Sequence, residues 1–271
     1  MLKQRVVTAL LLGIGVLLAI FLLPDWAWGI LIGAVITLAL WEWCTLVKIG
    51  RFGFALLVLL CTGSVVYCGF VPLRGLEDGL FLMGAGYALA MTFWIFSAPT
   101  FLYFKLEPAG WYWRYGVAVL LTVPTGIATI ELKHASPALL LAAVLVVCLA
   151  DICAFFTGRA FGKHKLAPEI SPGKTWEGVA GAVVGVLVFC VAVWFAVPVV
   201  AASIRLYWLL LLALVYVLVS VMGDLFESLI KREAGVKDSG TLLPGHGGVL
   251  DRIDAMLAFF PFAGATLLVL Q

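Results

Sequence analysis

The stretch GHGGVLDRID, from Gly245 to Asp254, combines three glycines with a histidine, an arginine and two aspartates. Asp251 and Asp254 are three positions apart, so on a helix they share one face. Together with Asp224, which closes an earlier apolar run, they offer three carboxylates of the kind that Mg²⁺ prefers. We therefore expect these three aspartates to hold Mg²⁺, and the pattern leaves a second cation open. The alternative for the Asp251 and Asp254 pair is helix capping.

Basic residues and glycines surround these aspartates. If a helix continues from the preceding apolar run, three- and four-residue spacing places Asp224, Glu227, Ser228, Lys231 and Arg232 on one face. The glycine-rich segment after Gly235 cannot be regular helix. Cations beside carboxylates suit a metal-bound polyphosphate, because the metal and the cations neutralise different phosphate oxygens. The predicted catalytic residues are Asp224, Lys231, Arg232, Lys237, Asp238, His246, Asp251, Arg252 and Asp254.

Another polar block, DICAFFTGRAFGKHKLAPEISPGKTWEG, runs from Asp151 to Gly178. Asp151 lies inside an apolar segment, where an ionisable side chain is costly and usually faces a cavity or a partner. The basic residues that follow it predict an anion-binding loop, although they could also serve only topology and contacts with anionic lipid headgroups. The predicted substrate-binding residues are Asp151, Arg159, Lys163, Lys165, Ser171, Lys174, Thr175, Glu177, Ser228, Ser239, Gly247 and Gly248.

The tripeptide Gly173-Lys174-Thr175 resembles the end of a nucleotide-binding P-loop. The resemblance fails because the motif requires a glycine where Pro168 stands, and no strand pattern precedes it. Thr175 and Glu177 instead suit the start of a helix, with Thr175 as the cap and Glu177 near the positive end of the helix dipole.

Two further polar residues have open roles. His246 could exchange protons, bind phosphate or support the loop, and we favour substrate positioning because the chain shows no histidine spacing typical of metal ligands. Glu42, in WEWCTLVK, is interpreted as a structural partner of a polar group elsewhere rather than as a functional residue.

The elements that must position these residues are membrane helices. The 271-residue chain is 64% hydrophobic and 12% charged, with a mean hydropathy of +1.16, which is far above the values of soluble domains. This composition predicts an all-α, polytopic integral membrane protein. Nine segments of about 20 residues are long enough to span a bilayer. They lie near residues 5–23, 26–45, 53–71, 79–98, 115–131, 137–157, 178–200, 206–223 and 252–270.

The basic residues indicate an orientation. If the chain crosses nine times, 14 of the 17 Lys and Arg residues fall on the side of the N-terminus, and only Arg74, Lys133 and Arg205 fall on the other. Because cytoplasmic loops are enriched in Lys and Arg, the N-terminus and both polar blocks are expected in the cytoplasm. The net charge of +2 gives no reason to expect nucleic-acid binding.

The charges also predict a division of the chain near residue 135. Residues 1–135 would form an N-terminal transmembrane region with few interior charges. Residues 136–271 would form a catalytic transmembrane region with polar loops at residues 158–177 and 224–251.

The segment from Ser228 to Asp254 resembles the signature of the phosphatidate cytidylyltransferase family, also called CDP-diacylglycerol synthases. The resemblance covers 27 consecutive residues, at Ser228, Lys231, Arg232, Lys237, Asp238, Gly240, Leu243, Pro244, His246, Gly247, Gly248, Asp251, Arg252 and Asp254. The stretches GRAFGKHKL and SPGKTWEG are also similar to that family, but Ile152 and Cys153 stand where small or hydroxyl residues are expected.

This resemblance implies an enzyme of the bacterial inner membrane that transfers a cytidylyl group from CTP to phosphatidate, with Mg²⁺ as cofactor and the active site facing the cytoplasm. Its implied partners are CTP, phosphatidate, membrane lipids and a second copy of the chain in a homodimer.

Other classes of protein stay open. A CTP-dependent polyprenol kinase would also need a polyphosphate site at the membrane face, but it would release CDP. A cation-coupled transporter could use intramembrane carboxylates, although the charges here gather in loops and no inverted repeat is evident. A lipid-binding scaffold would not need paired aspartates beside a glycine-rich loop.

Overall fold

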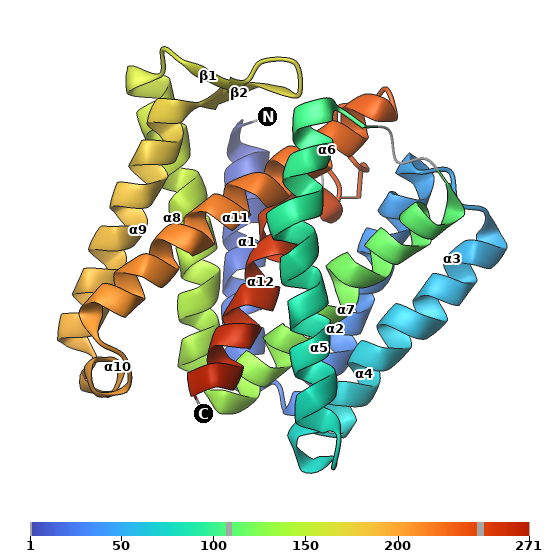
Figure 1. Ribbon diagram of the computed structural model, residues 1–271, viewed down its shortest axis with the longest axis vertical. Helices are drawn as coiled ribbons and strands as arrows, with labels where there is room; N and C mark the ends of the chain where they lie inside the picture. The colour runs from blue at the N-terminus through green and yellow to red at the C-terminus, as the bar shows by residue number, and fades with distance from the viewer. Residues whose placement is uncertain (1, 107–109, 243–246, 271) are drawn as a thin grey trace.

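The computed structural model describes residues 2–106, 110–242 and 247–270, and the side chains from residue 10 onward within them. These residues form a bundle of long helices with one small hairpin at its end (Figure 1). The first half contains α1 (Leu2–Leu22), α2 (Asp25–Leu46), α3 (Arg51–Leu57), η1 (Val58–Thr62), α4 (Gly63–Phe70), η2 (Leu73–Gly75), α5 (Gly79–Thr92), η3 (Phe93–Ser97), α6 (Ala98–Phe104) and α7 (Trp111–Ala135). The second half contains α8 (Pro137–Phe161), β1 (Lys165–Ala167), β2 (Ser171–Thr175), α9 (Trp176–Ala196), α10 (Pro198–Ser203), α11 (Leu206–Glu233) and α12 (Leu250–Leu270).

Eight helical segments among the described residues are long and apolar enough to cross a membrane. Two of them, Arg51–Phe70 and Gly79–Phe104, continue through the π-helical turns η1 and η3. The first predicted span corresponds to α1. The part of α1 whose side chains are described, Leu10–Leu22, is apolar but shorter than a full span. The all-α membrane architecture is therefore confirmed, while the count of nine spans stays a prediction.

Several predicted boundaries were wrong. The seventh span was expected to run from 178 to 200, but α9 ends at Ala196 because the chain becomes extended at Val197 and restarts as α10 at Pro198. The polar segment 158–177 was expected to be a loop. Its first residues extend α8, and an antiparallel hairpin pairs Lys165 with Thr175 and Ala167 with Ser171. Similarly, α11 continues to Glu233 inside the predicted loop 224–251.

Large apolar side chains cover the outside of the bundle as well as its core. Exposed examples on different helices are Phe155 in α8, Val188 in α9 and Leu218 in α11. Such a surface is costly in water and suited to lipid. The buried core is one cluster that includes residues from α2, α7, α11 and α12, so the two predicted regions share a single core. Whether they act as separate functional regions stays a prediction.

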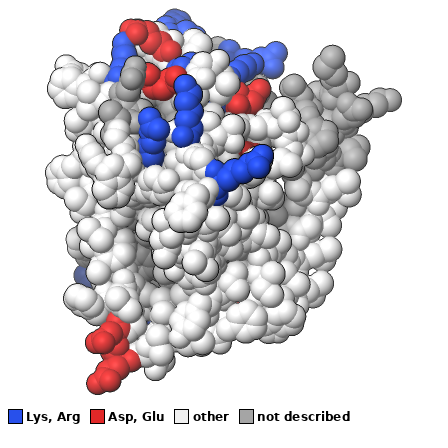
Figure 2. All heavy atoms as spheres, turned by 90° about the vertical axis from the view of Figure 1, so that its right-hand side faces the viewer, with Lys and Arg blue, Asp and Glu red and all other residues white. Residues whose placement is uncertain are grey.

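Most of the charged residues gather at one end of the bundle, which is called the polar end below and contains the hairpin β1–β2, the C-terminus of α11 and the N-terminus of α12. Figure 1 shows the chain's N-terminus at this end and its C-terminus at the other. On the face shown in Figure 2, Lys and Arg side chains concentrate at the polar end, and the middle of the bundle is almost free of charge. This separation agrees with the predicted sidedness of the basic residues.

Candidate active site

The polar end is built where α11 and α12 meet. α11 continues beyond its apolar run, carries polar residues from Asp224 onward and ends at Glu233. Gly235 then adopts a left-handed conformation with φ 74°, and the Val236 N–H donates to the Lys231 carbonyl at 2.9 Å. Glycine suits this turn because it has no Cβ to clash at positive φ. The chain can therefore turn back across the end of the bundle toward Leu250, where α12 begins.

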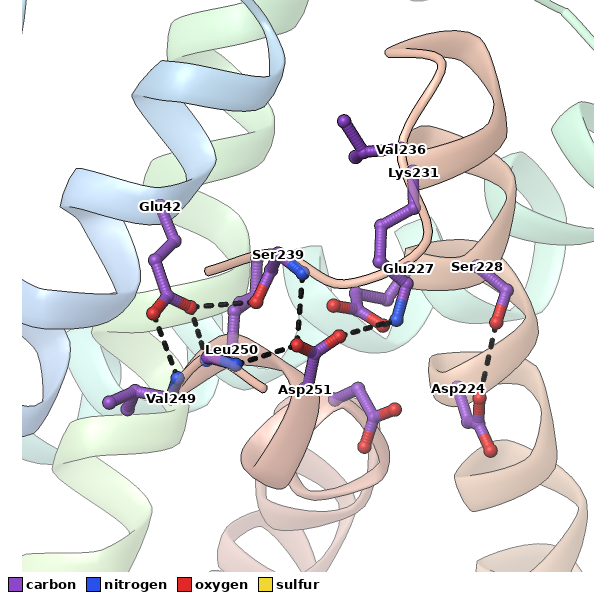
Figure 3. Close-up of polar contacts among 12 residues, drawn as sticks. Glu42, Asp224, Glu227, Ser228, Lys231, Val236, Ser239, Val249, Leu250 and Asp251 are labelled. Atoms are coloured by element: carbon purple, nitrogen blue, oxygen red, sulfur yellow. Dashed lines mark hydrogen bonds and ion pairs between the residues drawn. The ribbon is translucent and has the colours of Figure 1, made fainter. Parts of the chain in front are cut away.

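Lys231 links the two helices. Its side chain is 10% exposed, and its ammonium group forms ion pairs with Glu227 on the same helix face and with Asp251 Oδ1 at 2.6 Å (Figure 3). Glu227 and Asp251 are also buried, with side-chain exposures of 5% and 6%. The predicted shared face of α11 is confirmed for Glu227 and Lys231. The structure places the Lys231 charge between two carboxylates rather than at the surface.

Asp251 organises the loop that precedes its own helix. Its Oδ2 accepts hydrogen bonds from the Ser239 N–H at 2.9 Å and the Gly248 N–H at 2.8 Å. Gly247 beside it has φ 82°, and a Cβ at that position would lie 2.6 Å from Asp251 Oδ2. Both oxygens of Asp251 are therefore engaged within the protein, in the manner of the capping alternative.

Glu42 reaches the same loop from α2. Its carboxylate accepts hydrogen bonds from the Ser239 hydroxyl at 2.8 Å, the Val249 N–H at 2.9 Å and the Leu250 N–H at 2.8 Å (Figure 3). The predicted structural partnership of Glu42 is thus confirmed, but its partner could not be named from sequence because the bonded residues lie 197 to 208 positions away. The only signal was a carboxylate inside an apolar segment.

The hairpin is held against α11 and α9. Lys174 on β2 forms an ion pair with Asp224 at 2.6 Å, and the Arg232 Nε–H donates to the Ile170 carbonyl at 3.1 Å. Thr175 caps α9 as predicted, because its hydroxyl accepts a hydrogen bond from the Gly178 N–H at 3.1 Å. Glu177 follows in the first turn and pairs with His164 Nδ1 at 2.6 Å. The contacts of Thr175 and Glu177 are therefore structural.

Three carboxylates lie near one another below this hairpin. Asp224 on α11 also accepts a hydrogen bond from the Ser228 hydroxyl at 3.4 Å. Asp151 on α8 and Asp254 on α12 both interact electrostatically with Asp224 and with each other. Asp254 accepts a hydrogen bond from the Ala255 N–H at 2.7 Å. Three separate helices thus bring like charges together at the polar end.

Comparison with known proteins identifies the family. The family model described as "Cytidylyltransferase family" matches residues 3–270. The chain belongs to this family. Two relatives are both named phosphatidate cytidylyltransferase. That of Pseudomonas aeruginosa is 40% identical over 98% of this chain and 97% of its own, and that of Haemophilus influenzae is 36% identical over 97% of each. A third, from Bacillus subtilis, is 48% identical over 44% of each chain.

The protein is therefore an enzyme, a nucleotidyltransferase embedded in a membrane. The likeness to the first two relatives extends over the N-terminal region that supplies Glu42, as well as over the signature block. This coverage agrees with the geometry, in which α2 forms part of the polar end.

The remaining residues that were predicted for the site are spread over the polar end. Ser171 on β2 is half-buried, and Gly248 is buried beside Glu42. His246 lies outside the described residues. The exposed residues of the predicted site are Arg159, Lys163, Lys165, Lys237, Asp238 and Arg252. Their roles in binding substrate stay predictions.

The chemistry of these aspartates suits a divalent cation, because carboxylate oxygens are the ligands that Mg²⁺ prefers. Within residues 10–106, 110–242 and 247–270, however, no three metal-binding side chains converge on a single point. Asp151 and Asp254 each interact electrostatically with Asp224, whereas Asp251 is bound to Lys231 and the loop amides. The predicted set of Asp224, Asp251 and Asp254 is therefore brought together only in part.

Proposed function

We propose that this enzyme transfers the cytidylyl group of CTP to phosphatidate and produces CDP-diacylglycerol and pyrophosphate. The observation that carries this proposal is the family match over residues 3–270, together with near-complete coverage by relatives named phosphatidate cytidylyltransferase. The polar end supports it, since it combines cations, clustered carboxylates and a glycine-rich loop beside a lipid-facing surface.

The basic residues would divide between two anionic substrates. Arg232, Lys237 and Arg252 lie next to the glycine-rich loop and would contact the phosphates of CTP. The hairpin side, with Arg159, Lys163, Lys165 and Lys174, would recruit the phosphatidate headgroup or the nucleotide. Lys231 would stabilise the site indirectly, because its ammonium group is already paired with Glu227 and Asp251.

Mg²⁺ is the proposed cofactor, and a second cation stays open. Asp224 and Asp254 would hold it, with Asp151 as a neighbouring carboxylate. When bound, the ion would neutralise phosphate charge during the transfer. Asp251 would join this set only if it shared its oxygens with the ion, because Oδ1 already pairs with Lys231 and Oδ2 already accepts hydrogen bonds from the loop. Lys174 would have to share Asp224 with the ion.

The reaction then needs positioning and charge neutralisation more than proton transfer. A phosphate oxygen of phosphatidate attacks the α-phosphorus of CTP, and the new P–O bond forms as the bond from the α-phosphorus to the bridging oxygen of the β-phosphate breaks. Pyrophosphate leaves with the electrons of that bond. Because the attacking oxygen is already anionic at neutral pH, no general base is required, and His246 is proposed to position substrate.

The enzyme is proposed to lie in the bacterial inner membrane, with the polar end in the cytoplasm, where CTP is available. The bacterial relatives and the gathering of Lys and Arg at the polar end support this orientation. A homodimer is proposed from family resemblance alone.

The direct test is to incubate the purified protein with CTP, phosphatidate and Mg²⁺. We expect CDP-diacylglycerol and pyrophosphate in equal amounts, and neither product when Mg²⁺ is chelated. A folded preparation that yields neither product would overturn the proposed reaction.

A further inference from the structure

Glu42 occupies an unusual position for a carboxylate. It lies near the end of α2, in a segment apolar enough to span a membrane, and only 2% of its surface is exposed. Burying a carboxylate is costly unless hydrogen-bond donors satisfy its oxygens. The three donors that Glu42 has among the described residues all belong to the segment between Ser239 and Leu250. The side chain thus joins the N-terminal region to the glycine-rich loop.

These donors come from both ends of the loop. The Ser239 hydroxyl belongs to the stretch of chain that leaves α11, whereas the Val249 and Leu250 N–H groups belong to the start of α12. The carboxylate therefore holds the two ends of the loop together and also satisfies amides at the N-terminus of α12, where a negative charge is favourable. Asp251 binds the same two ends through the Ser239 and Gly248 amides.

The loop backbone approaches Glu42 so closely that only glycine fits at two positions. A Cβ at Gly240 would lie 2.5 Å from Glu42 Oε1, and a Cβ at Gly248 would lie 2.3 Å from Glu42 Oε2. Since the acceptor is a buried carboxylate fixed by three hydrogen bonds, it cannot move aside cheaply. Glycine at both positions therefore follows from the place that Glu42 takes in the fold.

We propose that Glu42 is a positioning residue of the enzyme, which holds together the two described ends of the loop, residues 239–240 and 248–250, and thereby sets where Asp254 and the amides of these ends meet CTP and its metal ion. Glu42 acts through the loop and contacts no substrate itself. The part of this proposal that concerns CTP rests on the proposed function, whereas the part that concerns the loop does not.

The first test is the isosteric variant Glu42→Gln. The glutamine side chain has one accepting oxygen where glutamate has two. Its NH₂ group therefore takes the place of a carboxylate oxygen that accepts hydrogen bonds in the wild type, and it cannot accept them. We expect at least one of the Val249 and Leu250 amides to exchange with deuterium about tenfold faster or more, because these two amides bind different oxygens and one of those hydrogen bonds is lost. We expect kcat/KM for CTP to fall by about tenfold or more for the same reason.

Glu131→Gln is the matched control. Glu131 is also a buried glutamate of a spanning helix, 4% exposed, but it pairs with Arg74 near the end of α7 that is remote from the polar end. This variant should lower thermal stability while KM for CTP and exchange at Val249 and Leu250 stay at wild-type values. Equal losses in both variants would mean that Glu42 contributes general stability only, which would overturn the proposal.

A double-mutant cycle of Glu42 and Ser239 tests whether Glu42 acts through its hydrogen bond to the loop or through a general loss of stability. If Glu42 positions the loop partly through the Ser239 hydroxyl, the effects of Glu42→Gln and Ser239→Ala on kcat/KM will be less than additive. Full additivity, or unchanged exchange at Val249 and Leu250 in folded Glu42→Gln, would contradict the proposal. If wild-type protein makes no CDP-diacylglycerol, the proposed function fails, but the exchange measurement still decides whether Glu42 fixes the loop.

Discussion

Lys231 shows how a single residue can link two helices at the polar end. Its ammonium group is the partner of two buried carboxylates, Glu227 and Asp251. Removing one member of a buried ionic group leaves the others uncompensated, which costs about 3–5 kcal/mol. We therefore expect Lys231→Met to lower the free energy of unfolding by about 3 kcal/mol or more.

The measurement is the midpoint of thermal unfolding in detergent micelles, compared with Lys105→Met. Lys105 pairs with Glu169 in an ion pair whose two side chains are 45% and 74% exposed. Because an exposed pair contributes little in water, Lys105→Met should unfold within a few degrees of wild type. Equal midpoints for Lys231→Met and Lys105→Met would show that Lys231 is not a structural centre.

The two aspartates of the DRID sequence should differ in their metal dependence. Asp254 interacts electrostatically with the carboxylates of Asp224 and Asp151, whereas Asp251 is bound to Lys231 and the loop. We expect Asp254→Asn to raise the Mg²⁺ concentration for half-maximal activity by about tenfold or more, since a charged ligand is lost. Asp251→Asn should mainly reduce kcat and speed deuterium exchange of the Ser239 and Gly248 amides. The reverse pattern would favour the predicted ligand role of Asp251.

Residue spacing predicted part of this site. The three- and four-residue spacing of α11 correctly predicted that Glu227 and Lys231 share a face, because helical periodicity is a local property. Spacing did not predict that Lys231 is buried between two acids, since burial depends on how α12 packs against α11. It also left capping and metal binding open for Asp251, and the observed hydrogen bonds resemble capping.

At the scale of elements, α8 and α9 place the hairpin through close contact of small residues. Gly178, at the start of α9, faces α8 so closely that a Cβ would lie 2.9 Å from the Ala154 carbonyl oxygen. We expect Gly178→Ala to separate the helices slightly, to destabilise the protein by about 1–3 kcal/mol and to weaken substrate binding at the hairpin.

The comparison for this prediction is Gly63→Ala. Gly63 is an exposed helical glycine in α4, and a Cβ added there would meet no atom within 4 Å. Its replacement should leave thermal stability unchanged or slightly higher, because alanine favours the helix. Thermal unfolding together with KM for phosphatidate measures both effects. Wild-type stability in Gly178→Ala would mean that the two helices are not in tight contact at this point.

The helices could be predicted from hydropathy because each spanning segment must be apolar along its whole length. The hairpin β1–β2 was not predicted, since a strand of 3 residues and one of 5 in a polar, glycine- and proline-containing segment give no clear alternation. The spacing of polar residues after residue 223 is compatible with a continuing helix, but the end of α11 at Glu233 was not predicted, because polar residues outside the membrane no longer mark helix boundaries.

For the whole molecule, the separation of charge between the two ends predicts one orientation in the membrane. Lys237 is exposed at the polar end, and Glu77 is exposed in the turn before α5, at the other end. In a cysteine-free background, Glu77→Cys should react with a membrane-impermeant thiol reagent in intact spheroplasts. Lys237→Cys should react only after permeabilisation. The opposite result would reverse the orientation derived from Lys and Arg.

The largest gap between sequence and structure concerns long-range contact. Hydropathy and motifs locate the polar end and the family, but they leave the N-terminal region without a role, because nothing in Glu42 or its neighbours indicates contact with a loop 197 to 208 residues later. Such a contact depends on how α2 packs into the common core with α12. Whether the division near residue 135 separates two functional regions stays a prediction, but residues from both sides of it contribute to the polar end.

The position of the transferred phosphorus tests the proposed reaction most directly. Purified enzyme would be given phosphatidate, Mg²⁺ and CTP labelled at either the α- or the γ-phosphorus. Cytidylyl transfer predicts that the α-label enters the lipid product and that the γ-label appears only in pyrophosphate. A γ-label in the lipid with release of CDP would identify a kinase and contradict the proposed reaction.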